Sequence, residues 1–246
     1  MNPGDNFETT DFDQNDWNSY RIRIWSWILI LFLCVLWPLS ILIVFNPPDD
    51  PDLLEKYDPI LRFYLPTIIF QLAVLAATFM VSRAEGSALS SLGYSKFEFI
   101  HLVQAIAFII VASLLLRLVG FILQQYDLLS FKSPEPLLPR TLMQKTVWIM
   151  LCIIVAVTEE TTYRGYLITR LSKISGSTIL AIIVSCLGFS AGHLYQGSGG
   201  AILLFFYGLM FALLYLGTRS LWPCIIAHFI HNALAPLFVD KIIVPL

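Results

Sequence analysis

Seven apolar stretches divide the chain, and most are close to the roughly 20 residues that a helix needs to cross a bilayer. Lipid offers no hydrogen bonds to the backbone, so helices are expected there and open sheet edges are not. We therefore predict an all-α fold, a polytopic membrane bundle of about seven transmembrane helices, with six to eight as the range. The stretches are Ile24–Phe45, Ile60–Ser82, Phe99–Leu123, Thr141–Val157 (continuing past Arg164), Gly176–Gly192, Ala201–Leu216 and Leu221–Val239.

Composition supports a membrane protein and excludes other classes. Hydrophobic residues make up 57% of the chain and charged residues 13%, against about 25% charged in soluble domains. The net charge of −2 gives no basic surface for nucleic acid, so the expected surroundings are the lipid bilayer. The four cysteines lie in apolar stretches without CxxC spacing, which indicates buried thiols rather than disulfides or a thiolate metal cluster. The short chain, without recognisable sorting signals, favours a prokaryotic cell (inner) membrane.

The chain divides into a tail and one membrane domain. Residues 1–23 form an acidic tail that is expected to be disordered, and an acidic tail is not a signal peptide, which needs a basic start. Residues 24–246 are expected to form a single transmembrane domain. Within it, the glycine-rich segment Gly197–Gly200 is predicted to be a loop.

Polar residues in the carboxy-terminal part of the chain carry the functional signal. They form three groups, Glu159–Arg164, Phe189–His193 and His228–Asn232, at the edges of or inside apolar stretches. A charged side chain at the centre of a membrane helix costs roughly 2.5 to 3.5 kcal/mol on insertion scales. We therefore expect these residues to pair with one another or to do chemistry.

The helical spacing indicates that the two adjacent glutamates have different partners. Glu160 and Arg164 are four residues apart, which is the spacing of an ion pair on one helix face. Adjacent helical residues point about 100° apart, so Glu159 faces elsewhere. Glu159 is thus the freer carboxylate and the candidate general base or acid.

The histidines suggest the rest of a site. His228 and Asn232 are four residues apart and can present two hydrogen-bond donors to one point, as an oxyanion requires. His193 follows a glycine at the end of its stretch, where it can meet water and neighbouring helices. His231 faces another way from His228, which indicates a packing role. We expect a site inside a bundle, assembled from facing helices.

The chain resembles the CPBP family of intramembrane endopeptidases in the order of three motifs. These are Glu-Glu-x-x-x-Arg, then Phe-x-x-x-His, then His-x-x-x-Asn. That family includes the CAAX prenyl proteases (the CAAX prenyl protease 2-like enzymes) and bacterial relatives once called abortive-infection, or Abi, proteins. The resemblance covers a catalytic core at about residues 141–240. It implies a glutamate-dependent endopeptidase that needs no cofactor and cleaves a membrane-associated or lipidated protein or peptide.

The resemblance also implies a role for each matching position. Glu159 would activate water for attack on the peptide carbonyl, and His193 would assist the proton transfer. His228 and Asn232 would stabilise the oxyanion. The supporting positions would be Glu160 and Arg164.

Three other readings remain open. A zinc-dependent intramembrane metallopeptidase could use Glu159, His193 and His228, whose types suit a site with three protein ligands, although a His-Glu-x-x-His pairing is missing. A serine protease could use Ser198, which lies among glycines. A non-catalytic membrane protein, acting in bacteriocin self-immunity or as a scaffold, could use the same polar residues to bind a partner.

Overall fold

The computed structural model describes residues 21–44, 58–125, 130 and 137–238, and within these every regular element is a helix. The amino-terminal elements are α2 (Ile24–Leu31), η1 (Phe32–Leu36), α3 (Trp37–Val44), η2 (Ile60–Tyr64), α5 (Leu65–Ala84), η3 (Leu89–Leu92) and α6 (Phe99–Gln124). The carboxy-terminal elements are α7 (Leu142–Glu159), η5 (Glu160–Ile168), α8 (Thr169–Ser175), α9 (Thr178–Ala191), η6 (Leu194–Gln196), α10 (Gly197–Thr218) and α11 (Leu221–Phe238).

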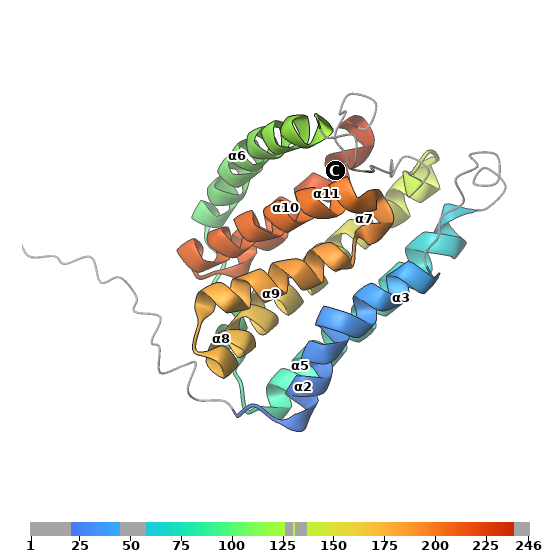
Figure 1. Ribbon diagram of the computed structural model, residues 1–246. Coiled ribbons are helices and arrows are strands. Elements are labelled where there is room, and N and C mark those ends of the chain that lie inside the picture. The colour runs from blue at the N-terminus through green and yellow to red at the C-terminus, as the bar shows by residue number, and fades with distance from the viewer. Residues whose placement is uncertain (1–20, 45–57, 126–129, 131–136, 239–246) are drawn as a thin grey trace, which may run out of the picture.

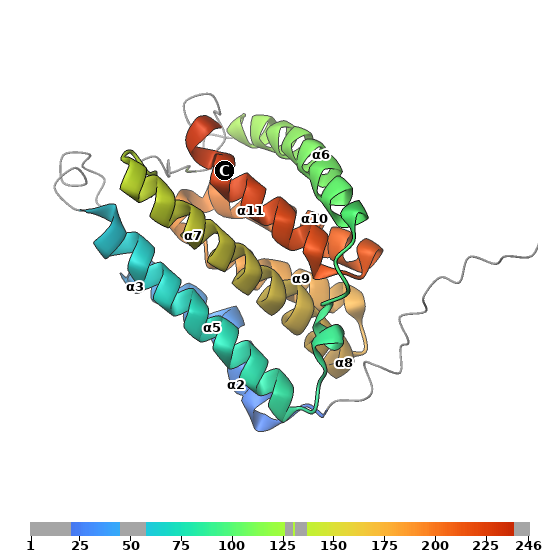
Figure 2. The same cartoon turned by 180° about the vertical axis from the view of Figure 1, so that it is seen from behind.

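The helices form two layers (Figure 1). One layer holds the α2–η1–α3 helix, α9 and α10. The other holds α5, then the continuous helix α7–η5–α8, then α11, as the reverse view shows (Figure 2). Helix α6 arches along one side and packs on α10 and α11. We call α7–η5–α8 the motif helix because it carries the glutamate motif; it lies between the amino-terminal helices and α11.

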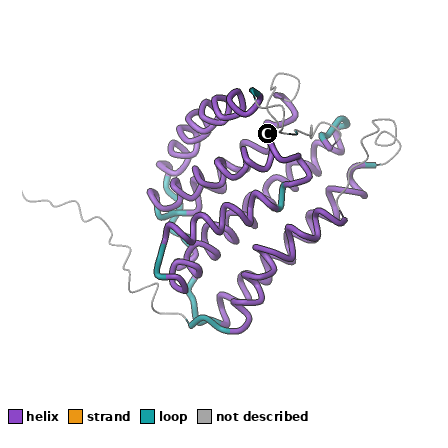
Figure 3. The backbone as a smooth tube through the Cα atoms, in the orientation of Figure 1, coloured by secondary structure: helices purple, strands orange, loops and turns teal. Residues whose placement is uncertain are grey.

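The predicted all-helical membrane bundle is confirmed, because each predicted apolar stretch is helical over most or all of its described residues (Figure 3). Within the described part of the chain, four helices are long and apolar enough to cross a membrane, and three apolar helices are shorter. Residues 1–20 of the predicted tail lie outside the described residues. The four long helices are Ile60–Ala84, Phe99–Gln124, Leu142–Ser175 and Leu194–Thr218, and the shorter ones are Ile24–Ser40, Thr178–Ala191 and Leu221–Leu237.

The loop predicted at Gly197–Gly200 is wrong, because these residues form the first turn of α10. Free N–H groups at the start of a helix need hydrogen-bond acceptors. Ser130, which is distant in the sequence, provides two of these acceptors. Its carbonyl oxygen accepts from Gly199 N–H at 2.8 Å and its hydroxyl from Ser198 N–H at 3.2 Å. Gly197 itself has a φ of 86°, which a side chain would disfavour. A cap from a distant residue leaves no local sequence signal.

Other helix starts are fixed locally. Thr141 precedes α7, and its hydroxyl accepts from Gln144 N–H at 3.2 Å while the Gln144 side chain accepts from Thr141 N–H at 3.1 Å. This reciprocal capping box satisfies two of the free donors. Ser177 caps α9 in a simpler way by accepting from Leu180 N–H at 3.3 Å. The motif helix therefore begins where its sequence predicts.

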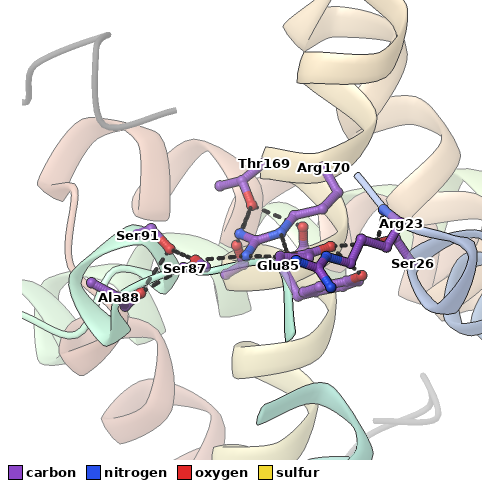
Figure 4. Close-up of polar contacts among 10 residues, drawn as sticks. Arg23, Ser26, Glu85, Ser87, Ala88, Ser91, Thr169 and Arg170 are labelled. Atoms are coloured by element: carbon purple, nitrogen blue, oxygen red, sulfur yellow. Dashed lines mark hydrogen bonds and ion pairs between the residues drawn. The ribbon is translucent and has the colours of Figure 1, made fainter. Parts of the chain in front are cut away.

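A buried ion pair joins the end of α5 to the motif helix (Figure 4). Arg170 donates to Glu85 Oε2 through Nε at 2.9 Å and Nη2 at 2.8 Å, and both side chains are fully buried. Ser26 and Tyr166 donate to the other oxygen, Glu85 Oε1, at 2.6 and 3.1 Å. A buried charge is tolerated when it is paired and hydrogen-bonded. This cluster therefore fixes α2 and α5 against the motif helix.

Replacing Arg170 by methionine should destabilise the fold, because the Glu85 carboxylate would stay buried without an opposite charge. We expect a loss of roughly 3 to 5 kcal/mol, measured from thermal unfolding of the detergent-purified protein. The double variant Glu85→Leu, Arg170→Met removes both charges and should unfold at a higher temperature than the single variant. A single variant as stable as the wild type would contradict this assignment.

Candidate active site

The four residues predicted to be catalytic line one cavity of about 480 Å³. Glu159 comes from the end of α7, His193 from the turn after α9, and His228 and Asn232 from α11. Residues far apart in the sequence are thus brought to one place. The rest of the lining is largely apolar and aromatic, and includes Trp37, Phe63, Phe70, Trp148, Leu151 and Phe189.

The glutamate motif lies on an unusual helical segment. Glu160–Ile168 is a π-helix, and all its residues are buried. Such wide turns are rare and are found frequently at functional sites. The segment also packs closely: a side chain at Gly165 would come within 2.5 Å of the Leu92 backbone oxygen. The motif therefore lies in a helix that is packed against several other elements, which restricts movement of its side chains.

Glu160 is the centre of a buried charge network. Its Oε1 accepts from Arg164 Nη1 at 2.9 Å, the pair that the spacing predicts, and from His228 Nδ1 at 2.6 Å. The Arg164 guanidinium also lies 4.6 Å from the Phe189 ring centroid and 5.0 Å from that of Phe211. Cation–π contacts of this kind favour a desolvated cation. Glu160 is fully buried and does not line the cavity, but it contacts His228, which does.

Glu159 is held differently from its neighbour. Its Oε1 accepts from Gln71 Nε2 at 2.9 Å, across from α5. Its Oε2 is buried without a hydrogen-bond partner and lies 3.8 Å from His228 Nε2. The side chain is 12% exposed and lines the cavity. One carboxylate oxygen is thus hydrogen-bonded, and the other has no hydrogen-bond partner among the described residues.

The geometry of His193 fixes its tautomer. Its Nδ1 lies 2.8 Å from the Phe189 carbonyl oxygen. A carbonyl only accepts, so Nδ1 carries the proton, and Nε2 of the neutral ring keeps a lone pair. His193 lines the cavity. It can therefore accept a proton there.

The sequence analysis missed several further polar residues that line the cavity, among them Gln71, Tyr207 and Trp148. Gln71 bonds Glu159, and the Tyr207 hydroxyl is buried without a hydrogen-bond partner. Trp148 Nε1 donates to the Asn232 backbone oxygen at 3.2 Å, which anchors that part of α11. A polar side chain inside the apolar stretch Ile60–Ser82 was a usable signal for Gln71.

His231 and Ser198 differ in where the structure places them. The His231 ring packs on Tyr207 with centroids 4.7 Å apart, as a packing role predicts, but it also lines the cavity. Ser198 is exposed, hydrogen-bonds Ser130 and is not among the lining residues, so the serine named as a possible nucleophile lies outside the cavity. Among the described residues, no three His, Cys, Asp or Glu side chains are grouped as a metal site requires.

Removing the cation that pairs with Glu160 should destabilise the protein more than neutralising Glu159. Arg164→Met leaves the Glu160 carboxylate buried without its cation, so we expect a loss of roughly 3 to 5 kcal/mol. Glu159→Gln keeps an oxygen to accept from Gln71 and should lie within about 1 kcal/mol of the wild type. Thermal unfolding of the purified variants measures both. Equal destabilisation by the two replacements would contradict the distinction drawn here.

Comparison with known proteins agrees with this site. Residues 141–234 match the family described as type II CAAX prenyl endopeptidase, Rce1-like. No curated protein and no solved structure matches the chain. The matched segment contains all four cavity residues named from the motifs, and the match confirms the resemblance to the CPBP endopeptidases. The similarity to the Rce1-like family of type II CAAX prenyl endopeptidases thus covers residues 141–234. With four long apolar helices among its described residues, the chain is an integral membrane protein.

Proposed function

We propose that the protein is an intramembrane endopeptidase in which Glu159 activates the attacking water. The observation that carries this proposal is the Glu159 carboxylate, which has one oxygen bound by Gln71 and the other without a hydrogen-bond partner beside the cavity. A general base needs a free acceptor at the place where the water binds. Glu160 also has an oxygen, Oε2, without a hydrogen-bond partner, but its side chain is fully buried and does not line the cavity, so it is not placed to reach a substrate.

In this mechanism, Glu159 removes a proton from water and the oxygen of that water bonds to the scissile carbonyl carbon. His193, with a lone pair on Nε2, assists this proton transfer. The carbonyl π electrons move onto oxygen and give a tetrahedral oxyanion. When the intermediate collapses, the carbon–nitrogen bond breaks and the proton passes to the leaving amine, so the products are a carboxylate and an amine.

His228 and Asn232 would stabilise the oxyanion. The His228 Nδ1–H is already engaged by Glu160, so this ring can donate to the substrate only from Nε2, and only as an imidazolium. The carboxylates of Glu160 and Glu159 lie 2.6 and 3.8 Å from the two ring nitrogens. The Asn232 amide, one helical turn further along α11, supplies the second donor.

The cavity indicates the chemical character of the substrate. Its walls carry a stacked aromatic pair, Trp37 and Phe70, with centroids 3.9 Å apart and planes 11° apart. Burying an apolar group against such walls is favourable. The proposed substrate is a membrane-associated or lipidated protein or peptide with an apolar group beside the scissile bond.

The direct test is cleavage by the detergent-purified protein of two internally quenched peptides, one farnesylated at a CAAX end and one tethered by palmitate without a prenyl group. Glu159→Gln should lower kcat by about a hundred- to ten-thousandfold, as expected for loss of a general base. His193→Ala should lower it in the same direction. Full activity of a folded Glu159→Gln protein would refute the glutamate mechanism.

The oxyanion assignment makes its own prediction. His228→Ala and Asn232→Ala should each lower kcat by about a hundred- to a thousandfold, with a smaller change in KM because these donors act mainly on the transition state. A zinc chelator run in parallel separates the alternatives. Cleavage that stops on chelation would favour the zinc reading, and a folded wild type that cleaves neither peptide would favour a non-catalytic role.

A further inference from the structure

One face of α5 presents a polar residue to the motif helix every seven residues. These residues are Gln71, Thr78 and, at the end of the helix, Glu85. A seven-residue repeat keeps one helix face against its neighbour over several turns. The Gln71 amide nitrogen lies 2.9 Å from a Glu159 carboxylate oxygen. The hydroxyl oxygens of Thr78 and Thr162 are 3.3 Å apart. The ion pair between Glu85 and Arg170 measures 2.8 Å from oxygen to nitrogen.

Gln71 differs from the other two because it lines the cavity. It is 5% exposed and is held twice to the motif helix. Its Nε2 donates to Glu159 Oε1 at 2.9 Å, and its backbone oxygen accepts from the Thr158 hydroxyl at 3.3 Å. Thr78 and Glu85 bind the same helix further along but do not line the cavity. Among the three contacts, only the first touches the residue proposed to be the base.

This contact determines the orientation of the Glu159 carboxylate. The terminal torsion of a glutamate side chain is broad and weakly constrained, so a fixed orientation needs an external partner. The Gln71 amide binds Oε1, while Oε2 keeps no hydrogen-bond partner and lies 3.8 Å from His228 Nε2. With Oε1 held from α5, Oε2 stays on the side of the carboxylate that faces His228 and keeps its acceptor free.

We propose that Gln71 is a positioning residue for Glu159, and that α5 thereby completes the active site from outside residues 141–234. This inference rests on the proposed function, because it assigns Gln71 a role through the base. It also gives the amino-terminal half of the chain a part in catalysis in addition to its packing.

The test compares Gln71→Met with Thr78→Val in the full-length purified protein, with the farnesylated quenched peptide as substrate. Gln71→Met removes the donor at similar size. Thr78→Val removes the next contact on the same face, from a residue that neither lines the cavity nor contacts Glu159. Displacing a supporting group typically costs ten- to a hundredfold in activity. We expect Gln71→Met to lower kcat by about that factor with KM within about twofold, and Thr78→Val to keep kcat within about twofold.

A second arm separates positioning from a loss of folded protein. In a Glu159→Gln background, adding Gln71→Met should leave the residual rate unchanged, because the group that it positions is already gone. Thermal midpoints of the two single variants and the double variant should also be non-additive, as for residues in contact. Gln71→Leu, measured in the same way, provides a second donor-free variant if Gln71→Met folds poorly.

Each outcome is decisive. If Gln71→Met keeps the wild-type kcat while Glu159→Gln loses it, the inference is wrong and the proposed function stands. If Gln71→Met and Thr78→Val lower kcat equally, Gln71 acts only through packing and the inference is again wrong. If Glu159→Gln keeps full activity, the proposed function itself fails, and the inference fails with it.

Discussion

The contact between Glu160, Arg164 and His228 is the interaction on which the candidate site depends. It buries a carboxylate with a guanidinium at 2.9 Å and an imidazole at 2.6 Å in the interior of the bundle. Low polarity strengthens such a network and makes an unpaired member costly. Through it, α11 is locked to the motif helix, so that His228 faces Glu159 across the cavity. Glu160 thus contacts His228 directly, while Glu159 keeps one carboxylate oxygen without a hydrogen-bond partner.

Much of this arrangement could be predicted from local patterns. The apolar stretches become helices, and the four-residue spacing of Glu160 and Arg164 becomes the ion pair. The three motifs named four residues that line one cavity. Each of these predictions depends on periodicity or on residue type, which the sequence displays directly.

What could not be predicted depends on contacts between distant segments. Gln71 and Glu159 are 88 positions apart, and no local pattern pairs them. The first turn of α10 was predicted as a loop because glycines are poor helix formers, but Ser130 caps it from elsewhere in the fold. The π-helical form of Glu160–Ile168 likewise depends on packing, including the close approach of Leu92 to Gly165.

The central claim is that Glu159 directs a water molecule onto the substrate. A single turnover in ¹⁸O-labelled water, with enzyme in excess over the farnesylated peptide, tests it most directly. Mass spectrometry of the products would then locate the label. Direct attack by water predicts one labelled oxygen in the new carboxylate and none in the Glu159 side chain. Label in Glu159, with unlabelled oxygen in the first product, would show that the carboxylate itself attacks and would contradict the account.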